Sequence, residues 1–470
     1  MNNILKYLTL GLLLILMGCS NNDEPDNGVK WDDDAKPLVK RGIDISYLEQ
    51  AFTLNFTATE TVPMSVNTHD NWIHTNFDQN SRRGQIEIMI DRNDHDEERS
   101  GSVRLIVGRY ITDIRIDQKA PVNAVPKEKG YVVENEANSI SIPVKANGTL
   151  SVNLYFPDSE WAKISDIKKD PAGDSDDWII SMDIDENTGL GRFAGIKLEV
   201  NGVPPMKGGN LYIVQQPGLL NEDMEVELQE PGMLQILLGS SSENLCRINN
   251  LTLKGNINAM DIAELDKLIG ANNMTTTPLS VDLSNTGLCV NINPFEAYGW
   301  QPATTISNRF DDPQEYLFDV LSSSYDLVHV SLPKNTTCIP SRAFSGICHK
   351  LKSIHLSMYL TEIGDYAFAN CPNLTEINIP EEAMLLTLGS HAFDTGSVIE
   401  SLTLSEYLNQ IADDAFAGCK VKNLHVHWTT PQPLEIVPQT EGCTLYVPQG
   451  TADIYRSTSN WCNFKQIVEE

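Results

Sequence analysis

The chain has few basic residues for its length. Its 470 residues include 34 Lys and Arg against 64 Asp and Glu, which gives a formal net charge of −30 at pH 7. Proteins that bind nucleic acid neutralise phosphates with clustered Lys and Arg, so this balance argues against nucleic acid as a partner. It also opposes adsorption to anionic lipid. The simplest role for the charge itself is to keep the protein soluble.

The sequence also lacks an apolar run long enough to cross a membrane. The stretch from Leu8 to Met17 has about ten residues where a spanning helix needs about twenty. Lys6 precedes it and Leu16-Met17-Gly18-Cys19 ends it, a pattern typical of an export signal. The ending resembles the lipobox of bacterial lipoproteins, which implies removal of a signal peptide, residues 1–18, and acylation of Cys19. An ordinary secretory signal with an incidental cysteine is the alternative.

Residues 19–37 are polar and acidic, and Ser20 to Gly28 include no apolar residue to bury. Such composition favours a flexible tether. An acidic run directly behind a lipidated cysteine resembles the signal that sends some Gram-negative lipoproteins to the outer face of the outer membrane. We therefore expect attachment to the outer membrane through the lipid anchor at Cys19, with the protein facing the cell exterior.

Cysteine is absent between Cys19 and Cys246, and no C-x-x-C pair occurs anywhere. The missing pair argues against a zinc site. Cys371 and Cys419 occupy matching places two repeats apart, about 10 Å if strands are spaced 4.8 Å, which is beyond disulfide reach. Most of these thiols are interpreted as small buried fillers. Cys443 with Cys462 is the one disulfide that we consider possible.

Common catalytic motifs are absent too. The sequence has no G-x-S-x-G, H-E-x-x-H or Walker loop. Residues 183–189 begin like a calcium loop, but Thr188 stands where glycine is needed and Ala194 where the final glutamate is needed. We therefore expect no enzyme activity, no cofactor and no bound metal.

Two stretches show the period-two alternation of half-buried antiparallel strands. In residues 38–120, Phe52, Leu54 and Phe56 alternate with polar neighbours, and residues 124–218 repeat the pattern from Ile140 and Ile142 onward. Short strands at this density predict two β-sandwich domains built on one plan.

The two stretches share three further features. Each has a Trp near its middle (Trp72, Trp161), an Arg-containing turn (Arg99-Ser100-Gly101, Arg192 to Gly195), and a last strand that ends on Gln (Gln118, Gln215). In these features they resemble BACON-type domains, which are immunoglobulin-like sandwiches of surface lipoproteins, often found beside glycan-handling modules. The resemblance implies capture of glycan for uptake, although the sandwiches could equally be spacers.

Residues 219–324 predict an N-terminal cap with irregular leucine-rich repeats. Asp261, followed by an acidic residue at Glu264, has the spacing of a helix N-cap, and Asp312-Pro313 can start a second helix that ends near Ser323. Caps of this kind cover the first exposed unit of a repeat array.

Ala-Phe pairs recur through residues 325–470. The pairs end at Phe344, Phe368, Phe393 and Phe416, at separations of 24, 25 and 23 residues, and an aliphatic residue lies four positions before each alanine. A unit of this length cannot bury its apolar face alone, so neighbouring units must stack, with the phenylalanines aligned in a row.

The strand motifs in these units share the form L-x-x-I-x-L, as in Leu351 to Leu356 and Leu374 to Ile379. Together with I-G-D-Y-A-F-A-N-C from Ile363 to Cys371 they resemble the BspA-like leucine-rich repeat, and the end of the chain resembles the C-terminal cap of the same proteins. One unit departs, because Asp394-Thr395-Gly396 replaces the cysteine turn and residues 381–386 include an insertion. The resemblance implies adhesion to host or neighbouring-cell protein. The predicted fold class is multidomain: two β-sandwich (immunoglobulin-like) domains followed by an α/β leucine-rich repeat solenoid.

The residues between the buried aliphatics should point outward from the sheet and form a polar ladder. They are Ser353, His355, Glu376, Asn378, Ser401, Thr403, Asn423 and His425. Such a lattice of hydrogen-bonding groups suits an extracellular protein or glycan, so we predict a non-catalytic binding protein, with adhesion and glycan capture for a polysaccharide uptake system as competing roles. A structural subunit of a surface assembly is a third. Outward residues can also be polar simply because they face water.

Overall fold

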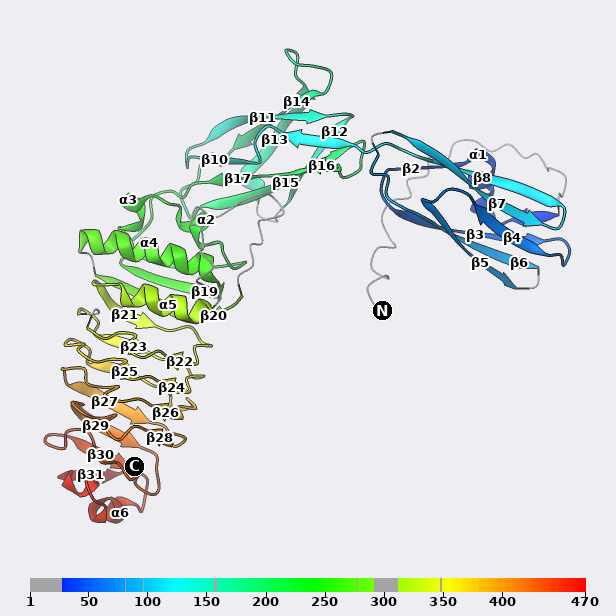
Figure 1. The fold of residues 1–470 in the computed structure, drawn as a ribbon. Helices are drawn as coiled ribbons and strands as arrows, with labels where there is room; N and C mark the ends of the chain where they lie inside the picture. The colour runs from blue at the N-terminus through cyan, green and yellow to red at the C-terminus, as the bar shows by residue number, and fades with distance from the viewer. Residues whose placement is uncertain are drawn as a thin grey trace. The chain divides into compact units, whose positions relative to one another are not determined.

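The structure is a computed structural model that describes residues 28–470 except 81, 96, 156–158, 277, 291–311 and 347–348. The chain divides into two compact units, one ending at Val122 and one running from Asn123 to Glu470 (Figure 1). The predicted signal peptide and Cys19 lie outside the described residues.

The first unit is a β-sandwich of two sheets. Alternate residues of its strands are buried, as in Leu54, Phe56, Ile86 and Ile88, and together they form one apolar core. One sheet has the order β1-β3-β6-β5 and the other β2-β8-β7-β4. Its elements are β1 (Val29–Trp31), α1 (Ala35–Arg41), β2 (Ile43–Ile45), β3 (Gln50–Ala58), β4 (Met64–Thr68), β5 (Ile73–Asn80), β6 (Arg83–Ile90), β7 (Arg99–Val107) and β8 (Tyr110–Gln118).

The tether prediction extends too far. Residues 29–31 pair with β3 in antiparallel register, and α1 follows at Ala35, so the sandwich begins before residue 38. Trp31 explains the difference: it is 8% exposed and its ring lies 5.2 Å from that of Phe56. A three-residue strand is too short to show a period in the sequence. The buried indole of Trp31 nevertheless holds this strand against the core of the sandwich.

The second unit opens with another sandwich of the same topology. Its sheets contain the orders β9-β11-β14-β13 and β10-β17-β15-β12, which reproduce the two sheets of the first unit strand for strand, with β16 added beside β9. The prediction that both stretches share one plan is confirmed. The elements are β9 (Asn123–Pro126), β10 (Gly130–Val133), β11 (Asn138–Ala146), β12 (Leu150–Tyr155), η1 (Ser159–Trp161), β13 (Ala162–Lys169), β14 (Asp177–Ile184), β15 (Arg192–Val200), β16 (Lys207–Gly208) and β17 (Asn210–Gln215).

The Trp, Arg and Gln that mark both sandwiches in the sequence lie together in each. In the first, the Arg99 guanidinium carbon lies 4.4 Å from the centre of the Trp72 ring, and Arg99 Nε donates to Gln118 Oε1 at 2.8 Å. In the second, the matching distances from Arg192 are 4.8 Å to Trp161 and 2.9 Å to Gln215.

Each cluster holds a loop. Arg99 donates to the carbonyls of Asp91 and Arg92, and Arg192 donates to those of Asp185 and Glu186. Partial burial lowers the pKa of both arginines, but charge-assisted bonds to carbonyls offset part of that cost. The calcium-like residues 183–189 therefore have a structural explanation, since their backbone is the acceptor for Arg192.

A second small core joins this sandwich to the helices that follow it. Phe193 and Val214 contact Ile236 and Met260, and the Gly191 N–H donates to the Leu237 carbonyl at 2.7 Å. A Cβ at residue 191 would lie 1.9 Å from the Ile236 carbonyl oxygen, so only glycine fits. The helices are α2 (Leu234–Leu238) and α3 (Ser242–Leu245).

A long parallel sheet, in the order β18-β19-β20-β21-β23-β25, begins in the predicted cap. Helices α4 and α5 lie on one side of its first strands (Figure 1). Helix α5 begins after Asp312 with Pro313 at its first position, as predicted. The elements are β18 (Asp223–Glu227), β19 (Asn250–Ile257), α4 (Ala259–Thr275), β20 (Leu279–Leu288), α5 (Pro313–Ser322), β21 (Leu327–Ser331), β23 (Ser353–His355) and β25 (Glu376–Asn378).

The predicted cap of α4 is wrong by three residues. The N-cap is Asn258, and Asp261 is the third helical residue of a capping box. The Asp261 carboxylate accepts hydrogen bonds from the N–H groups of Asn258, Gly232 and Leu234 at 2.7–3.0 Å. It thus connects the start of α4 to the start of α2, an interaction that local spacing could not reveal.

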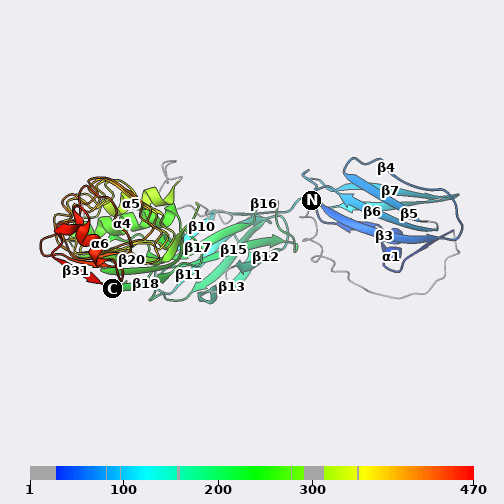
Figure 2. The same cartoon turned by 90° about the horizontal axis from the view of Figure 1, so that it is seen from below.

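The C-terminal units stack in register. Their second sheet, β22-β24-β26-β28, pairs in succession the four aliphatic residues that precede the Ala-Phe pairs: Ile339 with Ile363, Ile363 with Leu388, and Leu388 with Ile411. Seen along the stack, the units project onto one another (Figure 2). The remaining strands are β22 (Cys338–Ile339), β24 (Glu362–Ile363), β26 (Thr387–Leu388), β27 (Ile399–Leu404), β28 (Gln410–Ile411), β29 (Val421–Val426), β30 (Thr444–Val447) and β31 (Gln466–Glu469), with α6 (Ala452–Ser457) and η3 (Trp461–Asn463) near the end.

The predicted row of phenylalanines is confirmed. Ring centroids of Phe344, Phe368, Phe393 and Phe416 are 5.6, 6.1 and 6.1 Å apart in sequence order, with planes within 18° of parallel. All four side chains are at most 1% exposed. The unit without the cysteine turn keeps its place in the row, because Thr395 is buried and Gly396 makes the turn at φ 78°.

A second row, which the sequence did not predict, lies just before the Ala-Phe pairs. Arg342, Tyr366 and His391 all adopt left-handed backbone conformations, at φ 64°, 56° and 52°. Each donates its N–H to the next unit, to Asp365, Ser390 and Asp414, and the three side chains stack at 4.9–5.4 Å. These inter-unit contacts offset the cost of the conformation for residues with a Cβ.

Replacing Phe368 by Ala should destabilise the repeats strongly. Because the ring is buried between two others, we expect a loss of about 3–5 kcal/mol, seen as faster amide hydrogen exchange across residues 315–470. Tyr325→Ala, at a side chain 59% exposed, is the matched control and should change stability by less than about 0.5 kcal/mol. Equal effects of the two variants would contradict a shared core.

Stability should depend on the ionisation of Asp261. Burial raises its pKa from 3.8 to about 6 despite three hydrogen bonds to the carboxylate. Because the pKa is higher in the folded state than in the unfolded state, protonated Asp261 stabilises the fold. This contribution to the free energy of unfolding is complete below pH 4 and is lost as pH rises through 6. Relative to Asp261→Asn, the wild type should lose up to about 1.4 kcal/mol per pH unit across this window, measured from urea unfolding at several pH values. Parallel pH profiles for the two proteins would rule this out.

Candidate functional site

Two rows of outward side chains cross the long parallel sheet. The pairing register aligns Asn250, Ser280, His329, Ser353 and Glu376 in one row, and Thr252, Asp282, Ser331, His355 and Asn378 in the other. The residues between the rows, such as Val330 and Ile354, are at most 2% exposed. We call this surface the outer face.

Two similar rows lie on a separate sheet, β27-β29-β30-β31, whose first strand lies beside β25; we include them in the outer face. Ser401 pairs with Asn423, which pairs with Thr444 in the next strand, and Thr403 pairs with His425, which pairs with Tyr446. The structure therefore brings all eight predicted ladder residues onto one face.

Seven of the eight predicted residues are exposed or half-buried, but Ser353 is buried, with 7% of its surface exposed. Its hydroxyl oxygen lies 2.6 Å from Nδ1 of His329 in the neighbouring strand. Spacing predicts the direction in which a side chain points, but not whether a larger neighbour covers it. Ser353 therefore positions His329 and offers little surface to a ligand.

The outer face has a shallow hollow of about 320 Å³ over β19, β20, β21 and β23. Its lining includes Asp282, His329 and His355, with hydroxyl groups from Thr252, Ser280 and Ser331. Most of this lining comes from residues before 324, which the sequence assigned to a cap. The alternation in Ser280-Val281-Asp282-Leu283-Ser284 was the signal that could have revealed it.

Two further histidines on the outer face, His355 and His425, have acidic or aromatic neighbours. His355 Nε2 lies 3.6 Å from Glu376 Oε1, and its side chain is 49% exposed. His425 Nδ1 lies 2.8 Å from Glu470 Oε1, and its ring stacks on Tyr446 with centroids 4.3 Å apart. The outer face thus combines hydroxyl, amide, imidazole and carboxylate groups at fixed spacing, which suits multiple hydrogen bonds to one ligand.

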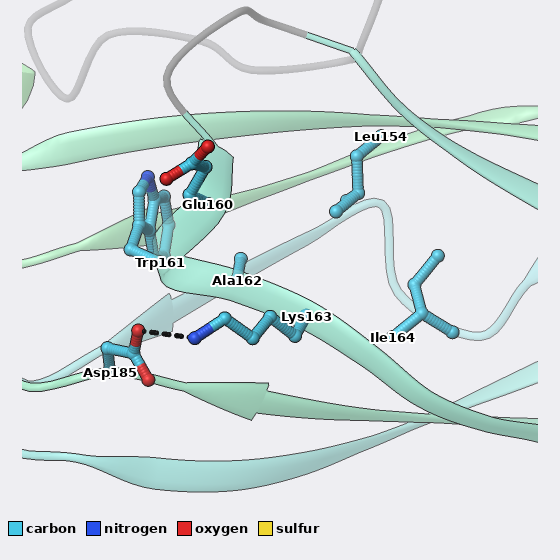
Figure 3. A pocket seen from close by; sticks show the side chains of 7 residues that line it. All are labelled: Leu154, Glu160, Trp161, Ala162, Lys163, Ile164 and Asp185. Atoms are coloured by element: carbon cyan, nitrogen blue, oxygen red, sulfur yellow. Dashed lines mark hydrogen bonds and ion pairs between the residues drawn. The ribbon is translucent and has the colours of Figure 1, made fainter.

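A wider depression of about 620 Å³ lies on the second sandwich (Figure 3). Lys163 Nζ and Asp185 Oδ2 form an ion pair at 2.9 Å beside Trp161, with Leu154 and Ile164 nearby. Trp161 is only 6% exposed, and Arg192 lies against its ring. Little aromatic surface is left for a ligand, so the outer face is the better candidate.

The possible disulfide is not formed. Cys443 and Cys462 are both free, the first buried and the second exposed. Cys443 faces the core just before β30, where burial raises its pKa to about 11, whereas Cys462 follows the buried Trp461 and is exposed to solvent. Cys371 and Cys419 are buried and free, and their thiols have pKa values raised to about 12, consistent with a filling role.

The described side chains include no cluster of three or more His, Cys, Asp and Glu that could hold a metal ion. Among the described segments, every helix is too short or too polar to span a bilayer.

Comparison with protein families gives one match: residues 315–431 fit the BspA type Leucine rich repeat region, in six copies. These units are leucine-rich repeats of the BspA type. The match starts inside α5 and covers β21 to β29, so the outer face from His329 to His425 lies within it. The hollow extends beyond it onto β19 and β20.

A comparison with curated proteins gives no significant match. Among solved structures, the I-band fragment I67-I69 from titin is similar at 9% identity and a TM-score of 0.23, covering 40% of this chain and 68% of the fragment. An endo-fucoidan hydrolase from glycoside hydrolase family 107 is similar at 12% identity and a TM-score of 0.17, covering 43% of this chain and 30% of the hydrolase. Scores this low carry no conclusion about the chain.

Proposed function

We propose that this protein binds a macromolecule outside the cell through the outer face of its leucine-rich repeats, without catalysis. The observation that carries the proposal is the register of the outer face, which sets two rows of hydrogen-bonding side chains around a hollow of about 320 Å³. In the proposed arrangement the repeats form a solenoid, and the acyl chains on Cys19 anchor the protein in the outer membrane.

The shape of the outer face favours a large ligand. Parallel strands repeat its groups about every 4.8 Å, so affinity can accumulate over many weak contacts along an extended partner. Solvation alone explains the presence of polar residues, but it does not require histidines held by partners, as His329 is by Ser353 and His425 by Glu470 and Tyr446. Fixed donors and acceptors lose less entropy on binding.

We infer that the ligand is a protein of a host or neighbouring cell, so that the protein acts in adhesion. The carboxylates of Asp282, Glu376 and Glu470 on or beside the outer face suit a partner with basic groups. In this arrangement the two sandwiches, proposed to be immunoglobulin-like domains of the BACON type, act as spacers. The alternative is glycan capture for polysaccharide uptake, which the serine, threonine and asparagine groups of the outer face would equally support.

The lipid anchor predicts a specific label. Cells expressing the protein should incorporate radiolabelled palmitate into it, and Cys19→Ala should abolish the label and release the protein from the membrane fraction. Cys462→Ala, at an exposed cysteine, is the control and should retain both label and location. Label that persists in Cys19→Ala would exclude this anchor.

Joint replacement of His355, Asn378, Thr403 and His425 by Ala should remove binding to immobilised extracellular proteins. Each side chain lies on the outer face, and losing four contacts should weaken affinity at least about tenfold. The matched control replaces Glu362, Thr387 and Gln410, which lie on the second sheet, and should bind normally. Retention of the wild type on polysaccharide affinity gels, lost in the same variant, would instead establish glycan capture.

Histidine footprinting gives an independent readout of the same contact. Bound ligand should protect His355 and His425 from diethylpyrocarbonate while leaving His74 unchanged. His74 is a suitable internal reference because its side chain is 50% exposed, close to the 49% of His355. Protection spread evenly over all three histidines would argue against the outer face.

A further inference from the structure

Three large apolar side chains stand half-exposed on successive turns that lead from the outer face to the second sheet. Tyr359, Met384 and Tyr407 are 57%, 55% and 45% exposed. We call them the Tyr-Met-Tyr row. The adjacent Met358 is 47% exposed and extends the same patch.

The register of the second sheet proves that the three residues are equivalent. Glu362 pairs with Thr387, and Thr387 pairs with Gln410. Each member of the row lies three residues before one of these, so the three occupy one column at successive units. Parallel strands are about 4.8 Å apart, which makes the row a continuous strip.

The backbone under the row is fixed. The residue after each member, Leu360, Leu385 or Leu408, is fully buried. The hydroxyl oxygens of Ser357 and Ser405 accept hydrogen bonds from the N–H groups of Tyr359 and Tyr407 at 3.0 and 3.2 Å. The tyrosines are therefore presented to solvent on rigid turns, which reduces the entropy lost on binding.

Solvation does not account for these residue types. The preceding unit has Asn335 at the equivalent position, three residues before Cys338, which is what a solvated turn requires. The turn between β25 and β26, which contains Met384, is two residues longer than the turn between β23 and β24.

The surroundings of the row are acidic. Glu381 and Glu382 precede Met384, Glu406 precedes Tyr407, and all three are exposed. Lys334 stands beside Asn335, one unit before Tyr359, so the acidic part is confined to the later units. Tyrosine rings attract Lys and Arg through cation–π contacts, and nearby carboxylates strengthen that attraction.

We propose that the Tyr-Met-Tyr row is a second contact surface, which docks a cationic polypeptide segment of a partner protein. Tyr and Met are enriched in the centres of protein interfaces, and the flexible Met between two rigid rings can adapt to the segment. The site lies beside the outer face and shares none of its residues, so it stands or falls independently of the proposed function.

The test uses the purified full chain and a fluorescein-labelled peptide of four Lys-Leu-Gly repeats, followed by fluorescence anisotropy. Wild type should bind saturably with one-to-one stoichiometry. Joint replacement Tyr359→Ser, Met384→Ser and Tyr407→Ser keeps the net charge and should weaken binding at least about tenfold. The matched control, Tyr325→Ser with Met274→Ser, changes a tyrosine and a methionine that are 59% and 86% exposed, and should bind as wild type does.

A second variant guards against loss of folding. Glu382→Gln with Glu406→Gln leaves all three apolar side chains and should weaken binding several-fold, with unchanged thermal unfolding. Equal affinity of the triple variant and the wild type would mean that only overall charge attracts the peptide, and would overturn the proposal. So would absence of peptide binding, or binding of cellohexaose that the triple variant abolishes, because the row would then be a carbohydrate platform.

Discussion

The stacking of one unit on the next is the interaction on which the outer face depends. No single unit could bury its own phenylalanine, because each ring packs against the ring of a neighbouring unit at 5.6–6.1 Å. Once the rings align, the parallel register of both sheets follows, and with it the columns of outward side chains. The order of the outer face is thus a consequence of what is buried behind it.

The sequence predicted this part of the fold well because its periods are long and repeated. The spacing of the Ala-Phe pairs and of the L-x-x-I-x-L motifs reflects the stacking of the units directly. The buried row of phenylalanines could therefore be predicted from this spacing, and so could the exposure of seven of the eight ladder residues. The burial of Ser353 could not, because it depends on His329 in another strand. The start of the outer face was missed for a related reason: β19 and β20 are separated by α4, and no repeat in the sequence links them.

The sandwiches show the opposite case, in which three scattered residues carry the information. Trp72, Arg99 and Gln118 are far apart in the chain, yet they meet in one cluster, and Trp161, Arg192 and Gln215 reproduce it. Their shared task is to hold a loop by its carbonyl groups. Features that invite a binding interpretation in the sequence are here part of the scaffold. The strand that contains Trp31 and the link that Asp261 makes between α2 and α4 were not predicted, because each depends on a single buried side chain.

The two extra residues before Met384 illustrate how this architecture can change. They lengthen one turn, yet Phe393 keeps its place in the buried stack and Thr387 keeps its pairing on both sides. Turn length is therefore decoupled from the core. Insertions at this edge can be sampled in evolution without refolding the protein, so the exposed side chains of this edge can diverge unit by unit while the framework stays constant.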